Sequence, residues 1–313
     1  MWFGPKAALT TLVLVAIEVA FSFDNAVINA KTLTRLSPLW QGLFLTVGML
    51  IAIAGMRIIF PILIVTLTAH LGWHQVVDDA LHHPRLYAQY LNNAHVSIAA
   101  FGAGFLMVLC LNFFLDHKRE LVWVSHIERP LRRLGTGTWL APAVATVVIV
   151  SSSFMSENFE TVWRAGLLGV VVFSLMNALV NGIALFSGGS GSAKYTGWGA
   201  AVAFIYLEVL DASFSFDGVL GAFAITTLVP LIAIGLGVGA LWVRSLTIFM
   251  VRNKTLSTYR YLEHGAHYAI LILAVALLVS IFIHVPDAVT GIAGLGVIIA
   301  SIIASREANL QRE

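Results

Sequence analysis

The stretch EVAFSFDNAV, residues 18–27, places two carboxylates six positions apart inside an apolar run that extends from about residue 7 to residue 30. The stretch DASFSFDGVL, residues 211–220, repeats this arrangement within another apolar run. An Asp at the centre of a membrane helix costs about 2.5–3.5 kcal/mol on insertion scales, and such residues usually serve a function. The fold therefore has to accommodate two buried acidic motifs.

The composition indicates an integral membrane protein. Of the 313 residues 59% are hydrophobic and only 11% are charged, and the mean hydropathy is +0.89. A soluble domain of this length would need more charge to cover its surface. The net charge of +2 gives no reason to expect a nucleic-acid partner. Cys110 is the single cysteine, which excludes a disulfide within the chain and a thiolate metal cage.

We expect an all-α polytopic protein that forms a single membrane domain over residues 1–313. A span needs roughly 20 apolar residues. About nine segments qualify: 7–30, 39–69, 95–115, 138–155, 162–186, 197–227, 229–251, 264–284 and 288–304. The first is expected to be a retained span rather than a cleaved signal peptide. Residues 70–94 form the main insertion outside the membrane, with a short helix that ends at Pro84, and 305–313 form a cytoplasmic tail.

The distribution of basic residues predicts the orientation, because cytoplasmic loops carry an excess of Lys and Arg. The other face of the membrane has only Lys6, Arg85 and Arg164. The side predicted to be cytoplasmic collects Lys31, Arg35, Lys118, Arg119, Arg129, Arg132, Arg133, Lys194, Arg252, Lys254, Arg260, Arg306 and Arg312. The amino terminus is therefore predicted outside and the carboxy terminus inside, with the basic 129–133 segment against anionic lipids.

The two acidic motifs align without a gap, which predicts an internal repeat. Glu18 falls opposite Asp211, and Asp24 falls opposite Asp217. Further matches in the same order are GMLIAIAGMR (48–57) with GLGVGALWVR (235–244), and Ala94-His95 with Ala266-His267. We expect a first repeat at 7–155, a linking span at 162–186 and a second repeat at 197–304. Five spans separate the first from the sixth, so the repeats are inverted, an architecture typical of secondary transporters.

The intramembrane charges predict a site for cations or protons. Five acids lie within the predicted spans, namely Glu18, Asp24, Glu208, Asp211 and Asp217, against only two arginines, Arg57 and Arg244. If all seven were ionised, their sum would be −5 + 2 = −3. Such an excess of negative charge has to be reduced by protonation of some of the acids or balanced by a bound cation. The two arginines are interpreted either as structural salt bridges or as counter-charges for an empty site.

Helix geometry limits how these acids can share one ion. Six residues turn about 600°, which leaves Glu18 and Asp24 about 120° and about 9 Å apart. One motif can chelate one ion only if its helix unwinds, for which Asn25 and Gly218 are the expected places. Alternatively, Asp24 and Asp217 meet across the axis between the repeats. Glu208 and Asp211 share one helix face in either case.

The available donor atoms favour a hard cation. They comprise the carboxylates, the Asn25 amide and the hydroxyls of Ser22 and Ser215, and oxygen donors suit Mg²⁺, Ca²⁺ and Mn²⁺. A contribution from His95 or His267 would favour Mn²⁺ over Ca²⁺. Outside the membrane, His74, Asp78 and His82 would share a face of the short insertion helix, where metal could collect or the face could simply be hydrated.

The acidic motifs also carry a family resemblance. The chain has E-x5-D-N at Glu18–Asn25 and E-V-x-D-x2-F-x2-D at Glu208–Asp217, followed by AFAIT at 222–226. These motifs resemble the TerC (tellurium-resistance) family of the LysE-like transporter superfamily. The family usually continues the second motif as D-S-I-P-A, whereas this chain reads D-G-V-L-G, which is closer to an offshoot described only as a domain of unknown function.

The resemblance implies a multi-pass protein of the bacterial inner membrane that exports manganese or a related divalent cation. The residues alone imply only a hard cation or protons. The expected partners are lipids and the transported ion; no resident cofactor is expected, and the oligomeric state is left open. A non-transporting scaffold in a metal or tellurite stress response is the alternative. An enzyme is not expected, because the chain lacks a metalloenzyme motif such as H-E-x-x-H.

Overall fold

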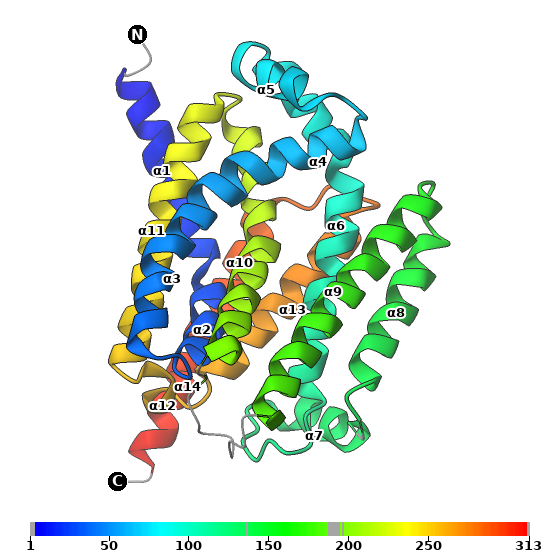
Figure 1. The fold of residues 1–313 in the computed structure, drawn as a ribbon. Coiled ribbons are helices and arrows are strands. Elements are labelled where there is room, and N and C mark those ends of the chain that lie inside the picture. Colours follow the sequence, from blue (N-terminus) through cyan, green and yellow to red (C-terminus); the bar gives the residue numbers. More distant parts are fainter. Residues whose placement is uncertain (1–3, 136, 187–194, 196, 312–313) are drawn as a thin grey trace. The chain divides into compact units, whose positions relative to one another are not determined.

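A computed structural model describes residues 4–135, 137–186, 195 and 197–311, and every regular element in this part of the chain is helical (Figure 1). The elements in chain order are α1 (Pro5–Phe21), α2 (Phe23–Leu33), α3 (Pro38–Leu50), η1 (Ile51–Ile59), α4 (Phe60–Thr68), α5 (Trp73–His82), α6 (Pro84–Phe114), α7 (Ser125–Leu134), α8 (Leu140–Ser153), α9 (Phe159–Phe186), α10 (Gly197–Ile225), α11 (Val229–Arg252), α12 (Thr255–Thr258), α13 (Leu262–Ser280) and α14 (Asp287–Leu310). The predicted all-α class is confirmed. Lys194 and Arg312, used above to predict orientation, lie outside the described residues.

Seven helical segments of the described chain are long and apolar enough to cross a membrane: Pro38–Ala69, which joins α3, η1 and α4, and α6, α9, α10, α11, α13 and α14. The α1–α2 pair passes the same test only as a bent unit, with 53° between the two axes. The predicted span at 138–155 corresponds to α8, which has only 14 residues. Each predicted segment thus coincides with a helix, and seven satisfy the length of a span without qualification.

Helix boundaries around the predicted insertion differ from the expectation. The short helix α5 ends before Pro84 as predicted, and Pro84 begins the long helix α6. Proline suits the first turn of a helix because the N–H that it lacks would have no intrahelical partner there. Residues 84–94, assigned from sequence to the insertion, are therefore the first three turns of the long helix α6.

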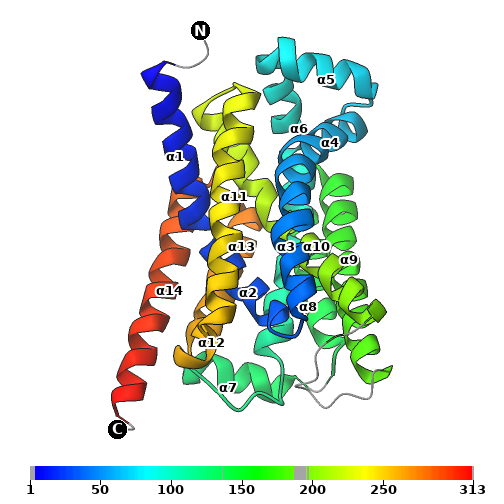
Figure 2. The ribbon, with the colours of Figure 1, turned by 60° about the vertical axis from the view of Figure 1, so that its left-hand side comes forward.

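The chain forms two compact units, each built from two separate stretches of sequence. The first unit contains Met1–His95 and Ser190–Phe249, and the second contains Val96–Gly189 and Met250–Glu313. In the first unit α1 and α10 run in opposite directions, as do α3 and α11 (Figures 1 and 2). A core of Leu14, Val219, Ala222, Ile232 and Leu236 joins α1, α10 and α11. This core holds together the helices that carry the acidic motifs.

The second unit pairs α13 with α14 and α8 with α9. The polar helix α7, which lies between α6 and α8 in the chain, also belongs to this unit, and its Glu128 is buried. The carboxylate of Glu128 accepts from His264 of α13, with Nδ1 at 3.0 Å from Oε1, and from the backbone N–H groups of Trp123 and Val124 at 3.2 Å each. Glu128 thereby attaches the basic helix α7 to the amino-terminal end of α13.

The Glu128 contacts predict a pH-dependent contribution to stability. Burial raises the pKa of the Glu128 carboxyl, but His264 and the two backbone donors outweigh burial and hold the pKa below its ordinary value of 4.5. A depressed acid stabilises the fold above its unfolded-state pKa and loses this effect as the pH falls through the folded-state pKa. We expect Glu128→Gln to destabilise the protein by about 1–3 kcal/mol at about pH 7, since hydrogen bonds to a charged group are lost.

Thermal unfolding of the purified protein in detergent measures this difference. The gap between wild type and Glu128→Gln should close as the pH falls below about 4.5. Glu120→Gln, at an exposed glutamate in the segment before α7, should follow the wild type throughout. A gap that stays constant at low pH would show that Glu128 does not act through its charge.

Candidate functional site

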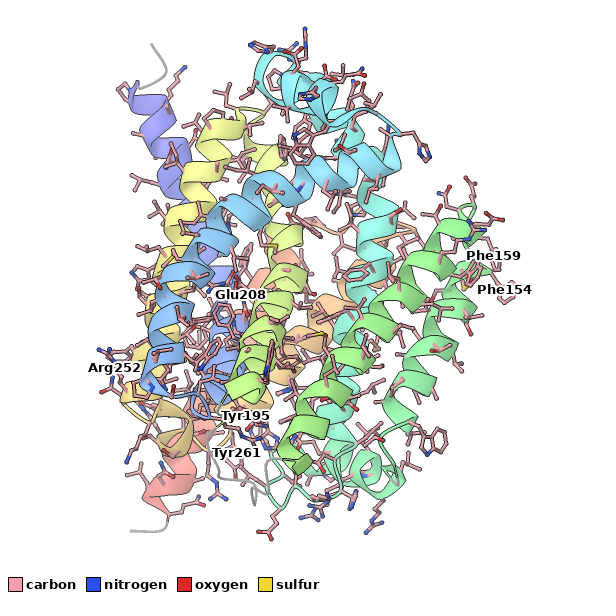
Figure 3. All side chains as sticks on the ribbon, in the orientation of Figure 1. Phe154, Phe159, Tyr195, Glu208, Arg252 and Tyr261 are labelled. Carbon is pink, nitrogen blue, oxygen red and sulfur yellow. The ribbon has the colours of Figure 1, made fainter. Side chains whose placement is uncertain are left out.

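A buried ion-pair cluster joins α10 and α11 in the first unit. Glu208 and Asp211 lie one turn apart on α10, and Glu208 is labelled in Figure 3. Arg244 of α11 donates to both oxygens of Glu208, from Nη1 to Oε1 at 3.0 Å and from Nη2 to Oε2 at 2.9 Å. Its Nη2 also donates to Oδ2 of Asp211 at 2.7 Å. The Arg244 side chain is 2% exposed, so one buried cation pairs with two carboxylates out of contact with water.

Helix α3 supports this cluster from its other side. Nη1 of Arg244 donates to the carbonyl oxygen of Phe44 at 2.9 Å, and the guanidinium carbon lies 4.3 Å from the centre of the Phe44 ring. A fork that pairs with carboxylates while lying over an aromatic ring is a geometry suited to Arg rather than Lys. The contacts fix the position of Arg244, because three helices hold it at once.

Gly48 of α3 allows the cluster to approach the helix backbone. A Cβ built at Gly48 would lie 2.2 Å from Nη1 of Arg244 and 2.5 Å from Oε1 of Glu208. No real side-chain carbon tolerates such distances, so any larger residue has to displace the ion pair. The glycine is therefore explained by the close packing of α3 against the charged cluster.

We expect Gly48→Ala to destabilise the purified protein by about 1–3 kcal/mol through overpacking. Gly42→Ala is the matched control, because Gly42 lies on the same helix and a Cβ there meets no atom within 4 Å. The control should be neutral or stabilising by up to about 1 kcal/mol, since Ala is the better helix former. Thermal unfolding in one detergent compares the two variants. Equal effects at both positions would contradict the packing argument.

A second buried ion pair joins α1 to the segment between α3 and α4. Nη2 of Arg57 donates to Oε1 of Glu18, and Nη1 donates to the carbonyl of Ala52 at 2.7 Å. Arg57 lies in η1, a π-helical segment of nine residues. Pro61, the second residue of α4, cannot donate to the carbonyl of residue 57, which accounts for a disturbed hydrogen-bond ladder here. Segments with π-helical turns occur frequently at functional sites.

The first acidic motif is interrupted between its two acids. The break lies at Ser22, whose φ of −104° and ψ of 16° separate α1 from α2. This position differs from the expected unwinding after Asp24, at Asn25, and α10 is helical throughout Gly197–Ile225, with no break at Gly218. Asp24 consequently lies in the first turn of α2. There its Oδ1 accepts the backbone N–H of Asn25 at 2.8 Å.

The environment of Asp24 differs from that of Glu18, Glu208 and Asp211. Asp24 is 6% exposed, and none of the described lysines and arginines forms an ion pair with it. The positive end of the α2 dipole instead stabilises its charge, since the first N–H groups of a helix lack intrahelical acceptors. A break of this kind can expose the last carbonyls of the preceding helix as cation ligands, as in the broken helices of transporters.

Asn25 connects the two acidic motifs directly. Its Nδ2 donates to Oδ1 of Asp211 at 2.8 Å, and its Oδ1 accepts from Nδ2 of Asn29, also at 2.8 Å. Both asparagines are buried, and Oδ1 of Asn29 has no partner among the described residues. Asn29 was not among the site residues predicted from the sequence. The signal was available in DNAVINA, where a second amide follows Asn25 by one helical turn inside an apolar run.

The remaining predicted site residues are placed as follows. Asp217 and Ser215 belong to α10, but their side chains lie outside the described residues. Ser22 is the residue at the break. His95, expected at the entrance of a span, lies well inside α6 instead, because α6 begins at Pro84. His267 belongs to the second unit, where its ring stacks on Phe113 with centroids 3.5 Å apart and its Nδ1 donates to the carbonyl of Glu263 at 2.7 Å.

The first unit thus brings together four of the predicted acids, both arginines and Asn25. The four intramembrane acids with described side chains and the two arginines carry a net charge of −4 + 2 = −2 when all are ionised. Paired acids of this kind need their arginines, because a buried charge without a partner is costly. The excess negative charge, together with the two buried asparagines that follow Asp24 on α2, forms an arrangement that can accept a cation.

Comparison with family models gives a match over residues 23–312 to a family described as a protein of unknown function, DUF475. The chain belongs to this family. The match extends from the start of α2 to the end of the described chain and so includes Asp24, Asn25, Asn29 and the second acidic motif. The expected unknown-function affiliation is thereby confirmed, while TerC and the LysE-like superfamily are not part of this match. Searches of curated proteins and of solved structures found no match.

Proposed function

We propose that the protein is a membrane transporter that exports a divalent cation, with Mn²⁺ as the expected substrate and Ca²⁺ or Mg²⁺ as alternatives. The observation that carries the proposal is Asp24, a buried carboxylate just after a helix break that pairs with none of the described arginines and lysines and is followed on α2 by two buried asparagines. A structural acid in an apolar bundle would be expected to have a basic partner. An acid that binds a transported ion would not be expected to have such a partner.

The donor set around Asp24 supports a hard or borderline cation. It comprises the Asp24 carboxylate, the Oδ1 atoms of Asn25 and Asn29 and the carbonyls at the end of α1. Carboxylate, amide and carbonyl oxygens suit Mg²⁺, Ca²⁺ and Mn²⁺. The choice of manganese rests on the resemblance of the motifs to the TerC family.

The acids that pair with arginines connect the binding of an ion to changes elsewhere in the site. Asp211 accepts from both Asn25 and Arg244, so an ion that draws in the Asn25 amide changes a hydrogen bond to an acid of the other motif. An ion that approaches Glu18 or Asp211 competes with Arg57 or Arg244 for the carboxylate. Protons can take the place of the departing ion on the same oxygens, which makes proton-coupled exchange the simplest cycle.

Two features support the inverted repeat that this mechanism needs. The pairs Glu18–Arg57 and Asp211–Arg244 join positions that correspond in the sequence alignment. The helices that carry them are antiparallel, α1 to α10 and α3 to α11 (Figure 2). Alternating access by rocking of inverted repeats is the usual mode of such folds. We place the amino terminus and α5 on the outer side, following the distribution of basic residues.

Flux measurements in liposomes test the proposal. Purified protein is reconstituted around a metal-sensitive dye, and Mn²⁺, Mg²⁺ and Ca²⁺ are added in turn, with protein-free liposomes as the reference. Transport is expected for Mn²⁺ above the protein-free rate, and an imposed pH gradient should change that rate if protons are exchanged. Rates equal to those of protein-free liposomes for all three ions would reject the transporter and favour a scaffold.

A further inference from the structure

The helix α5 carries a cluster of metal-ligating side chains that is separate from the buried acids. One ligand atom from each of Asp78, Asp79 and His83 can be chosen so that all three lie within 4.8 Å of one another. Helical periodicity alone predicted a shared face of His74, Asp78 and His82, and Asp78 and His82 do lie together, with Nδ1 of His82 2.8 Å from Oδ1 of Asp78. His74 is not part of the described cluster, and the chain leaves the helix after His82 and turns His83 toward Asp79.

The Asp79 side chain is unusual for an acid on a short surface helix. It is 7% exposed, although its neighbours Asp78 and His83 are exposed. Its Oδ1 lies 3.3 Å from Nδ1 of His83, so the carboxylate is directed into the cluster. Its Oδ2 is buried and has no hydrogen-bond partner among the described residues. A buried carboxylate oxygen normally has a partner, and one that lacks it calls for an explanation such as an ion.

We propose that Asp78, Asp79 and His83 bind a divalent transition-metal cation on the insertion of the first unit. Ligand atoms in such a site lie about 2.0–2.2 Å from the metal, so neighbouring ligand atoms lie about 2.8–3.6 Å from one another. The separations of up to 4.8 Å contract to this range by rotation of the two exposed side chains. Three protein ligands leave the remaining positions to water, as in an exchangeable site.

The mixed donor set determines which cations the site selects. Two carboxylates alone would suit Mg²⁺ or Ca²⁺, whereas the imidazole of His83 favours Mn²⁺, Co²⁺ and Zn²⁺ over both. The carboxylates disfavour Cu⁺, which prefers thiolate and thioether sulfur. The expected order of affinity follows the general series, with Mn²⁺ weaker than Co²⁺ and Zn²⁺.

The proposed site adjoins, along α5, a residue that lines a pocket of the first unit. Ala80, the residue after Asp79, lines a small pocket together with Arg57, Pro61, Tyr87, Phe223 and Ile232. Arg57 is the partner of Glu18, so the pocket reaches one of the two ion pairs. A role in passing the ion to or from the membrane rests on the proposed transport function. The proposed binding of a metal ion at α5 does not rest on that function.

Metal titration of the full-length protein in detergent tests the proposal. Co²⁺ binding is followed by visible absorption and by calorimetry, in a background of Asp24→Asn that removes the proposed intramembrane site. Because Asp79 is buried and its replacement can perturb folding, the test uses His83→Gln and Asp78→Asn, both at exposed side chains. His74→Gln, at an exposed residue of the same helix outside the cluster, is the matched control.

The expected result is one Co²⁺ per chain, with a dissociation constant raised at least about tenfold by His83→Gln and by Asp78→Asn and unchanged by His74→Gln. Competition by Mg²⁺ should be weak. Absence of Co²⁺ binding, or equal affinity in the His83 and His74 variants, overturns the site and leaves Asp78–His82 and Asp79–His83 as ordinary ion pairs of a helix. Because liposome flux is measured separately, failure of this site and failure of transport are distinguishable.

Discussion

Asp24→Asn is expected to abolish cation export while leaving the protein folded. The variant keeps the size of the side chain and keeps an oxygen that can accept the Asn25 N–H, now 2.8 Å from Oδ1 of Asp24. It removes the one described intramembrane acid that no arginine neutralises. Because no ion pair is broken, the cost to stability should stay within about 1 kcal/mol. The loss of a negative ligand should reduce Mn²⁺ flux to that of protein-free liposomes.

Two measurements on the same preparation separate function from folding. Flux is measured in liposomes, and thermal unfolding is measured in detergent. Asp24→Glu, which retains the charge, should keep part of the flux, and Glu120→Gln, an exposed control in the second unit, should keep all of it. In cells, the Asp24→Asn protein should leave manganese accumulation at the level of an empty vector. Flux equal to wild type in a properly inserted variant would contradict the assignment of Asp24.

The contrast between Asp24 and the other acids could be predicted from the sequence only in part. The excess of acids over arginines was visible, as was the correspondence of Arg57 with Arg244. The partner of each arginine was not, because ion pairs such as Arg244–Glu208 join residues 36 positions apart and depend on how α10 packs against α11. The sequence therefore predicted a common acidic site, whereas arginines pair with three of the four intramembrane acids whose side chains the structure describes.

Local backbone features were predicted less well than the helices themselves. Apolar runs identified every long helix, because each must bury its backbone polar groups within one segment. Hydropathy also placed a boundary at residue 95, but polar residues extend α6 back to Pro84, since a helix does not end where the membrane does. No glycine or proline lies next to Ser22, so the sequence gives no signal of the break there. The π-helical segment around Arg57 depends on Pro61 and on the contacts of a buried guanidinium.

Arg244→Met is expected to be the most destabilising single substitution in the first unit. Methionine fills part of the space over the Phe44 ring but leaves Glu208 and Asp211 buried without their cation. Removal of one partner from a buried ion pair costs about 3–5 kcal/mol. We therefore expect a large fall in folded yield and in the unfolding temperature measured in detergent. Arg252→Met, at the exposed end of the same helix, should leave both unchanged.

The triple variant Arg244→Met/Glu208→Gln/Asp211→Asn decides whether charge or packing is responsible. Neutral amides need no counter-charge, and replacing a whole buried ion pair by uncharged groups is often neutral or stabilising. The triple variant should recover most of the lost stability but transport no Mn²⁺, because Asp211 no longer couples Asn25 to Arg244. Arg244→Lys should fall between wild type and Arg244→Met, since lysine keeps the charge but cannot form the paired hydrogen bonds to Glu208. A triple variant as unstable as Arg244→Met would assign the cost to the packing of the guanidinium on Phe44 instead of to the uncompensated acids.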